Sequence, residues 1–267
     1  MLETLKEIAR EIYSVVHPLL GKSKAGMIIG SGFGGDKTRL IDKAAEEAIV
    51  RFLEANGLSC TFIGEERGIQ EIGKKPSFYL ITDAVDGTTN AVRGISFVSA
   101  SLATSLTNSL DDLDASVVID LSSGGIYEAE RGKGARHNGK RIKPSETENL
   151  EDAVLSIDVS RAPVNIEKAV PLLKTAKSLR SFGSAALEIC QVASGLLDAY
   201  VDVRTKLRTV DIAAGMLILK EAGGVFLQPD GKGFHEIPLT ELRRFSVIAA
   251  ANKRIYNEIA SLILSRI

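Results

Sequence analysis

The chain has 267 residues, 45% of them hydrophobic, so it is long enough to bury one large core or two packed lobes. Its 33 basic and 34 acidic residues nearly cancel without forming blocks of one sign, which argues against nucleic acid or a membrane surface as a partner. No uncharged apolar run reaches the roughly 18 residues that a membrane-spanning helix needs, and the N-terminus does not read as a signal peptide. We therefore expect a soluble, cytoplasmic protein.

Cysteine and histidine are too sparse to build a soft-metal site. The two cysteines, Cys60 and Cys190, lack metal-ligand spacing, and the three histidines lie far apart in the sequence. A metal in this chain must therefore be held mainly by carboxylate oxygens, which favour Mg²⁺, Mn²⁺ or Ca²⁺. The same scarcity argues against a Ser-His-Asp hydrolase, and no G-x-S-x-G segment is present.

The first half of the chain predicts helices followed by strands. Apolar residues that recur every three or four positions indicate helices, and apolar runs bounded by turn residues indicate strands, the later of which form an antiparallel meander. The predicted elements are helices over residues 2–19 and 38–56 and strands over residues 59–64, 78–81, 97–106, 115–121 and 126–129. The glycine-rich residues 21–37 are predicted to form a loop.

Near Pro144 the pattern changes, and strands then alternate with helices as in an α/β arrangement. The predicted elements are strands over residues 154–157, 178–180, 199–201 and 245–250 and helices over residues 165–175, 185–194, 211–222 and from 252 onward. We therefore divide the chain into an N-terminal α+β lobe, residues 1–144, and a C-terminal α/β lobe, residues 145–267, that pack closely together.

One short segment carries the strongest chemical signal. Asp83 and Asp86 follow a predicted strand, Gly87 permits a sharp turn, and Thr88 begins what reads as a helix. Two carboxylates at the end of a strand can share a hard cation, and free amides at the start of a helix can hold a phosphate. The simpler alternative is an Asp-Gly turn between a strand and the next element.

Four carboxylates lie where predicted loops or helices begin: Glu65, Asp83, Asp86 and Asp211. The ends of strands are where an α/β fold places its binding crevice. Three of them have a structural alternative, which is solvation for Glu65 and helix capping for Asp86 and Asp211. Because the chain lacks histidines and an activated nucleophile near them, the four together favour a site for two or three metal ions.

The glycine-rich segment offers a competing interpretation. Residues 30–35 contain a G-x-G-x-x-G match before a helix, and Glu54 follows about twenty residues later, as in a dinucleotide-binding oxidoreductase. However, the preceding strand would be very short, and a helix rather than a βαβ unit comes before it. We favour a mobile glycine-rich loop and keep the oxidoreductase, and a metal-binding protein without turnover, as alternatives.

Three segments together resemble the signatures of the inositol monophosphatase family, in the family's order and approximate spacing. They are Gly64-Glu65-Glu66, Asp83-x-x-Asp86-Gly87-Thr88-Thr89-Asn90 and Asp211-Ile-Ala213-Ala214-Gly215. The opening Lys37-Thr38-Arg39-x-x-Asp42 resembles the archaeal members, which often hydrolyse both inositol monophosphate and fructose 1,6-bisphosphate. The sequence departs from the family at Ala84 and Val85, where proline and a larger aliphatic residue are usual, and at Val210, where tryptophan is frequent.

The resemblance implies a mixed α+β fold, a layered α-β-α-β-α sandwich of the sugar phosphatase type. It also implies a homodimeric, metal-dependent phosphoric monoester hydrolase that works with two or three Mg²⁺ ions, for which Mn²⁺ can substitute. The implied substrate is a small sugar phosphate. The implied metal ligands are the carboxylates of Glu65, Asp83, Asp86 and Asp211 and the backbone carbonyl of Val85.

The resemblance also assigns roles around the metals. Asp42 would orient a water beside the metal, its alternative being a solvated helix residue. Thr88, together with Glu65, would align the attacking water. The backbone amides of Gly87 and Thr88 would bind phosphate oxygens.

The resemblance also implies substrate contacts, and one of them can be aligned with two different positions of this chain. Gly183, Ser184 and Ala185 resemble the sugar-contact turn, although Ser184 also suits ordinary helix capping. The family's hydroxyl-binding acid aligns with Asp202 from one side and with Arg204 from the other.

An arginine at position 204 can clamp a second phosphate through paired hydrogen bonds, which favours a bisphosphate substrate. The alternative is that Arg204 and the nearby basic residues Lys206 and Arg208 face solvent or a partner subunit. A 3′-phosphoadenosine or NADP phosphatase of the same superfamily is a further alternative, although an aromatic content of 5% without tryptophan offers few platforms for stacking an adenine.

Overall fold

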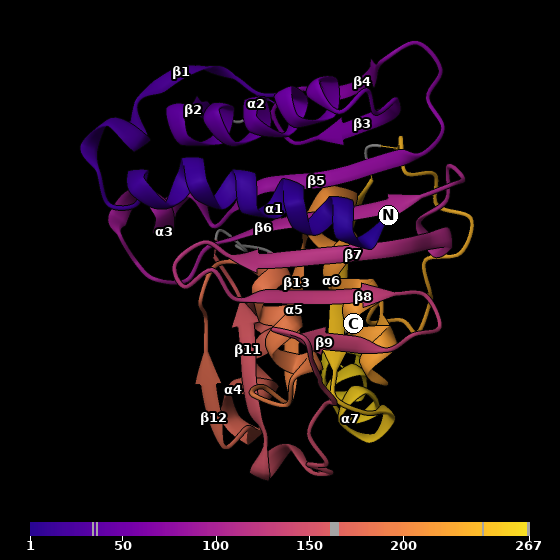
Figure 1. The fold of residues 1–267 in the computed structure, drawn as a ribbon. Coiled ribbons are helices and arrows are strands. Elements are labelled where there is room, and N and C mark those ends of the chain that lie inside the picture. Colours follow the sequence, from indigo (N-terminus) through magenta and orange to yellow (C-terminus); the bar gives the residue numbers. More distant parts are fainter. Residues whose placement is uncertain (34, 36, 161–165, 242, 266–267) are drawn as a thin grey trace.

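A computed structural model describes residues 1–33, 35, 37–160, 166–241 and 243–265. Over these residues the chain stacks five layers, in the order helices, sheet, helices, sheet, helices (Figure 1). The helices are α1 (Leu2–Val16), α2 (Leu40–Ala55), α3 (Thr88–Arg93), α4 (Ile166–Thr175), α5 (Ala185–Ala193), α6 (Thr209–Ala222) and α7 (Lys253–Leu264). The mixed α+β class and the layered sandwich predicted from the sequence are confirmed.

The larger sheet contains eight strands in the order β10-β9-β8-β7-β6-β5-β3-β4. The strands are β3 (Cys60–Gly64), β4 (Gly68–Ile72), β5 (Tyr79–Asp86), β6 (Ser99–Ser105), β7 (Leu113–Asp120), β8 (Ile126–Glu130), β9 (Ala135–His137) and β10 (Lys140–Arg141). All neighbours are antiparallel except β3 and β5, which run parallel with Gly64 opposite Thr82. Glu65 and Asp83 therefore emerge together at one edge of the sheet.

The second sheet contains five strands in the order β12-β11-β13-β15-β14. The strands are β11 (Val154–Asp158), β12 (Ser178–Arg180), β13 (Ala199–Arg208), β14 (Val225–Leu227) and β15 (Arg244–Ala250). β11 runs parallel to both of its neighbours, and β15 runs antiparallel to both of its own. Helix α6 follows β13 without an intervening loop, so the end of this strand fixes where α6 begins.

Alternation along the strands explains the layering. Side chains of successive strand residues point to opposite faces of a sheet. In β5, Leu80 packs with α1 and α2 on the outer face, and Ile81 packs with α5 and α6 between the sheets. In β13, Tyr200 faces the middle layer, and Val201 faces α4 and α7 on the far side.

Helix α6 lies at the centre of the molecule. Every residue from Thr209 to Leu219 is buried, which is the pattern of a helix enclosed on all sides. Close packing is possible because Gly215 meets Ile189 of α5 where a Cβ atom would come within 3.0 Å. This burial holds the start of α6, and with it Asp211, in a defined position.

Two strands run further than the sequence predicted. β5 continues through Asp83 to Asp86, because its pairing with β6 resumes at Asp86 and Ser99 beyond an irregularity in the register. The two aspartates therefore belong to the end of the strand and not to a turn after it. β13 likewise continues to Arg208, with an irregularity between Asp202 and Leu207 at the positive φ of Thr205 (56°).

The described residues of the glycine-rich segment are flanked by antiparallel strands, which is not the setting of a dinucleotide-binding turn. β1 (Ile28–Ser31) and β2 (Lys37–Arg39) pair antiparallel on either side of it, so a hairpin replaces the predicted loop and no βαβ unit surrounds the glycines. The sequence did not reveal the hairpin because all four residues of β1 are exposed and show no alternation. Gly34 and Asp36, which belong to the predicted loop, residue 165, which begins a predicted helix, and residues 266–267, at the end of the last predicted helix, lie outside the described residues.

The short strands β4 and β14 were also not predicted. The three central residues of β4 are exposed, so its sequence carries no periodic apolar signal. Over the described part of the chain, no helix is long and apolar enough to cross a membrane. The first sheet ends at Arg141 and the second begins at Val154, and the division into two lobes near residue 144 stays an interpretation.

Candidate active site

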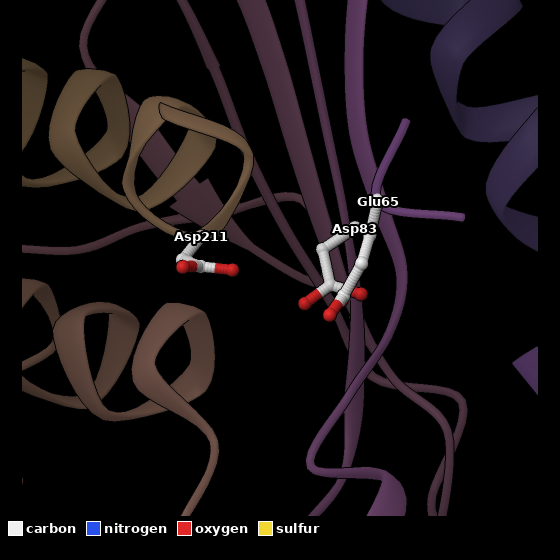
Figure 2. A group of neighbouring side chains, drawn as sticks. All are labelled: Glu65, Asp83 and Asp211. Carbon is white, nitrogen blue, oxygen red and sulfur yellow. The ribbon is translucent and has the colours of Figure 1, made fainter. Parts of the chain in front are cut away.

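Three carboxylates from distant parts of the chain meet at one point. One oxygen from each of Glu65, Asp83 and Asp211 lies within 4.8 Å of the other two. Figure 2 shows Glu65 and Asp83 side by side at the ends of neighbouring strands, with Asp211 pointing toward them from the start of α6. The parallel pairing of β3 with β5 places the first two, and the enclosure of α6 between the sheets places the third.

Asp211 also caps its helix. Its Oδ2 atom accepts a hydrogen bond from the backbone N–H of Arg208 at 2.6 Å. The sequence placed Asp211 at the first position of the helix, but the helix begins at Thr209 and Asp211 caps it from the third position. Because a carboxylate has two oxygens and several lone pairs, capping does not prevent the group from facing Glu65 and Asp83. The structural and the metal-site interpretations of Asp211 are therefore compatible.

Asp86 lies beside the cluster but outside the group of three. Its Oδ2 atom accepts hydrogen bonds from the Ser184 hydroxyl and the Ala186 backbone N–H, both at 2.8 Å. These contacts tie the end of β5 to the start of α5, so the predicted residues Asp86, Ser184 and Ala185 are brought together in space. Ser184 is engaged with Asp86 and also lies 2.9 Å from the Ser99 hydroxyl.

Burial, together with neighbouring negative charges, raises the pKa values of Glu65, Asp83 and Asp86. Burial, followed by the negative charges of Glu65, Asp86 and Asp211, raises the pKa of Asp83 well above its usual value. Burial raises the pKa of Asp86 to about 7, although its hydrogen bond from Ser184 opposes the shift. Burial also raises the pKa of Glu65 to about 7, against the opposing effect of Arg208. A bound cation would relieve this repulsion.

The donor set therefore fits a divalent metal ion. Carboxylate oxygens in a buried, crowded group are ligands for hard cations such as Mg²⁺, Mn²⁺ or Ca²⁺. The described residues that line the neighbouring cavity include no cysteine or histidine, so nothing there favours a softer metal. The cluster is able to hold a metal ion, as the sequence predicted.

Asp42 lines a small cavity with Glu65 and Asp83, and Thr88 lines the neighbouring cavity beside the same two carboxylates. Asp42 accepts a hydrogen bond from the backbone N–H of Arg39 at 3.0 Å through Oδ2, while its buried Oδ1 has no partner among the described residues. Burial raises the pKa of Asp42 to about 6, and the nearby Thr88 hydroxyl opposes this shift. Thr88 also donates to the Val85 carbonyl at 3.2 Å. The helix residue Asp42 is thus buried, not solvated.

Gly87 sits at a close approach of two segments. Its φ of 96° lies in the left-handed region, and a Cβ atom there would come within 3.0 Å of the Gly183 carbonyl oxygen. Buried Asn90 reinforces the contact, since its Nδ2 donates to the carbonyls of Phe97 at 2.8 Å and Phe182 at 2.6 Å. The turn after β5 and the predicted sugar-contact turn therefore support one another.

Gly87→Ala is expected to lower both stability and turnover. A side chain at positive φ costs about 1–3 kcal/mol, and displacing the 183 turn by even 1 Å can cost roughly 100-fold in rate. The measurements are the melting temperature and kcat for the phosphate release that the sequence resemblance implies.

Gly223→Ala is the matched control for this change. Its φ of 98° is nearly the same, but a Cβ atom there meets nothing within 4 Å. It should lose stability and keep turnover, and similar kcat values for the two variants would contradict a positioning role for Gly87.

A cavity of about 280 Å³ opens beside the carboxylates. Its walls include Val85, Gly87 and Thr88 on one side and Gly183 and Ala185 on the other. The cationic side chains of its wall are those of Arg204, Lys206, Arg208 and Arg244. A larger hollow of about 890 Å³ continues from it and shares Gly183, Arg204, Lys206 and Arg244. A negatively charged group at the carboxylate cluster would therefore meet compensating positive charge within the same cavity.

Asp202 and Arg204 are joined to one another. Arg204 donates to Asp202 through its backbone N–H at 2.8 Å and its Nε at 2.9 Å, and its Nη1 pairs with Asp158 at 2.7 Å. Asp202 is fully buried and does not line the cavity, whereas Arg204 and Asp158 do. Two carboxylates already balance the charge of Arg204. Arg244 is exposed, whereas Arg204 and Arg208 are only partly exposed.

The sequence did not assign roles to three residues that the structure places here: Asn90, Arg208 and Arg244. Asn90 lies within the motif that begins at Asp83, and this position was the only feature of the sequence that indicated a role for it. Arg208 directly precedes the helix that carries Asp211, and its contact with Glu65 spans 143 positions of the chain (208 minus 65), which local patterns cannot reveal.

Comparison with known proteins supports a single relationship. The family model described as "Inositol monophosphatase family" matches residues 1–267. A fructose-1,6-bisphosphatase/inositol-1-monophosphatase of Methanothermobacter thermautotrophicus is 34% identical over 261 residues, covering 94% of this chain and 92% of that protein. A solved structure of an inositol monophosphatase–fructose 1,6-bisphosphatase, 31% identical, superposes with a TM-score of 0.84 over 97% of this chain and 98% of the other.

A second type of relative is longer than this chain. A bifunctional NADP phosphatase/NAD kinase of Methanococcus maripaludis is 36% identical over 250 residues, which cover 87% of this chain but 44% of that protein. The full-length family match, the shared fold and the converging acidic residues lead to one conclusion: the chain belongs to the inositol monophosphatase family.

Proposed function

We propose that this protein is a Mg²⁺-dependent phosphomonoesterase that hydrolyses inositol monophosphate and fructose 1,6-bisphosphate. The observation that carries the proposal is the convergence of the Glu65, Asp83 and Asp211 carboxylates at a cavity with a cationic wall. The bifunctional names of archaeal relatives in the same family support the choice of substrates.

The residues that would hold the metal ions are Glu65, Asp83, Asp86 and Asp211 with the carbonyl of Val85. When bound, the ions would lower the pKa of a water and offset the charge of the leaving alkoxide. The protein's own part is to hold the phosphoryl group at the amides of Gly87 and Thr88 and to exclude other orientations.

Asp42 and Thr88 would orient the attacking water. The unpartnered Oδ1 of Asp42 supports this role, because a buried carboxylate oxygen without a donor is able to accept a proton or a hydrogen bond. The pKa of about 6 keeps Asp42 largely ionised near neutral pH, as an acceptor requires. The Thr88 hydroxyl lies between this carboxylate and the backbone of β5.

The alcohol part of the substrate would occupy the cavity beyond Gly183 and Ala185. A second phosphate would lie against the cationic wall, where Arg204 and Arg244 line both the smaller cavity and the larger hollow. Of these two, Arg244 is the exposed one, and its Nη1 donates to the Lys206 carbonyl at 3.1 Å. This refines the sequence expectation, which placed the second phosphate at Arg204 alone.

Arg244→Gln is expected to raise KM for fructose 1,6-bisphosphate by roughly 10- to 100-fold, as for loss of a charged hydrogen bond. KM for inositol 1-phosphate, which has one phosphate, should change little. Steady-state kinetics on both substrates measure the difference. Arg254→Gln, on α7 outside the cavity and paired with Glu148, is the control. An equal effect of Arg244→Gln on both substrates would contradict the assignment.

NADP is the second candidate substrate. One of the relatives is named for NADP phosphatase activity, and the larger hollow of about 890 Å³, lined by Phe182 among others, has room for a nucleotide. An oxidoreductase that binds a dinucleotide at the glycine-rich segment has no such support, since the described strands on either side of it, β1 and β2, pair antiparallel.

The test is phosphate release from inositol 1-phosphate, fructose 1,6-bisphosphate, adenosine 3′,5′-bisphosphate and NADP, measured in parallel with Mg²⁺ and with EDTA. Release from both sugar phosphates that EDTA abolishes would support the proposal. Release from the nucleotides alone would show that the substrate is a nucleotide phosphate and not a sugar phosphate. Release from none of the four would favour a metal-binding protein without turnover. The predicted homodimer is checked by light scattering of the same preparation.

A further inference from the structure

Arg208 places a permanent positive charge inside the acidic cluster. Its Nη2 atom lies 2.7 Å from Oε1 of Glu65 and 3.0 Å from Oδ1 of Asp211. Its Nε atom adds a hydrogen bond to Oδ2 of Asp211 at 3.2 Å. The guanidinium thus joins two of the three carboxylates that face one another, and it cannot lose its charge in a protein.

The backbone fixes Arg208 in this place. It is the last residue of β13, paired with Arg244 of β15, and its own N–H is held by Asp211. Its side chain is 19% exposed, so the charge sits in a largely desolvated site where electrostatic interactions are stronger than in water. The contact joins the end of β3 in the first sheet to the start of α6, which follows the second sheet.

The positive charge of Arg208 affects the metal-free protein and the binding of a metal ion in opposite ways. Without a cation, the carboxylates repel one another, and the guanidinium is the positive group in contact with two of them. A divalent cation at the same carboxylates would meet the repulsion of a fixed positive charge only a few ångströms away. The same residue is therefore favourable to the metal-free protein and unfavourable to metal binding.

We propose that Arg208 is a positioning residue that serves as the built-in counter-cation of the acidic cluster. It holds Glu65 and Asp211 in place when no metal is bound and weakens the affinity of the site for the divalent cation. This inference rests on the proposed function only in assuming that a divalent cation binds at these carboxylates.

A purely structural ion pair makes the opposite prediction for the metal. If Arg208 only kept the carboxylates in position, its removal would disorder the ligands and weaken metal binding. If it competes with the metal, its removal strengthens metal binding and at the same time destabilises the metal-free protein. The sign of the change in metal affinity therefore separates the two roles.

The experiment compares wild type with Arg208→Gln by calorimetric titration with Mg²⁺ and by thermal melting in EDTA. We expect the variant to bind Mg²⁺ about tenfold more tightly, since a nearby like charge is removed, and to melt several degrees lower in EDTA. Arg208→Lys keeps the charge but loses the two-pronged geometry, so its Mg²⁺ affinity should lie between those of wild type and Arg208→Gln.

Arg254→Gln is the control, because Arg254 also pairs with a carboxylate, that of Glu148, but lies on α7 outside the cavity. It should leave Mg²⁺ affinity within about twofold of wild type. If Arg208→Gln is recovered only in the presence of Mg²⁺, competition against a chelator of known affinity gives the same comparison.

The outcomes separate this inference from the proposed function. Tighter Mg²⁺ binding by Arg208→Gln together with a lower melting temperature in EDTA supports the counter-cation role. Unchanged or weaker Mg²⁺ binding by Arg208→Gln, with wild type binding normally, overturns it and leaves the proposed function intact. Failure of wild type to bind Mg²⁺ or Mn²⁺ overturns the proposed function, and the counter-cation role with it.

Discussion

Replacing Asp83 by Asn is expected to lower kcat for phosphate release by at least about 10³-fold at saturating Mg²⁺. Asp83 is the most enclosed carboxylate of the group of three, and Oδ1 accepts the Val85 backbone N–H at 3.0 Å. Asparagine nearly reproduces the shape of the side chain but brings no negative charge to a cation shared with Glu65 and Asp211. Steady-state release of inorganic phosphate from inositol 1-phosphate is the measurement.

The same substitution should stabilise the metal-free protein. Burial and then repulsion from Glu65, Asp86 and Asp211 raise the pKa of Asp83, so an uncharged asparagine avoids the cost of an ionised carboxylate in the folded state. The melting temperature in EDTA should rise, while the further rise that Mg²⁺ causes in wild type should shrink. Asp230→Asn, in a turn outside the cavity, should change neither property. Turnover near the wild-type value in Asp83→Asn would refute the assigned site.

Much of the fold follows from local sequence patterns, and the exceptions have a common cause. The alternating faces of β5, β13 and the meander were readable because each strand buries one or both faces. β4 and the hairpin strand β1 are exposed edges with no apolar period, so only pairing with their neighbours defines them. The end of β5 is buried, and the strand extends through Asp83 and Asp86 because its pairing with β6 resumes there.

The sequence predicted the residues of the candidate site whose own side chains could bind a metal ion. Glu65, Asp83 and Asp211 were selected for their positions at the ends of elements, and the fold brings them within one group. Arg208 and Arg244 were not, because their importance arises from contacts between segments far apart in the sequence. The burial of Asp202 against Arg204 is likewise a tertiary property, and which of the two approaches a substrate stays a prediction.

Metal-free protein is expected to lose stability as the pH rises from 6 to 8. The pKa values of Glu65 and Asp86 are raised to about 7 from ordinary values of 4.5 and 3.8. Between these limits the folded state binds more protons than the unfolded state, so the free energy of unfolding falls with increasing pH. The stabilising effect of protonation is complete below pH 4 and is lost as the pH passes 7. Two such groups account for about 2–3 kcal/mol between pH 6 and 8.

Saturating Mg²⁺ should offset this loss of stability at higher pH. Metal ligands must be ionised, so binding releases their protons and becomes more favourable as the pH rises. The melting temperature with Mg²⁺ minus that with EDTA should therefore grow from pH 6 to pH 8. Glu46 and Glu188, whose pKa values burial also raises to about 7, lie outside the group of three and leave a pH dependence that Mg²⁺ does not remove. A difference between the two melting temperatures that is equal at both pH values would show that the cation binds without displacing protons. In that case the crowded carboxylates would not be its ligands, and the proposed site would have to be placed elsewhere.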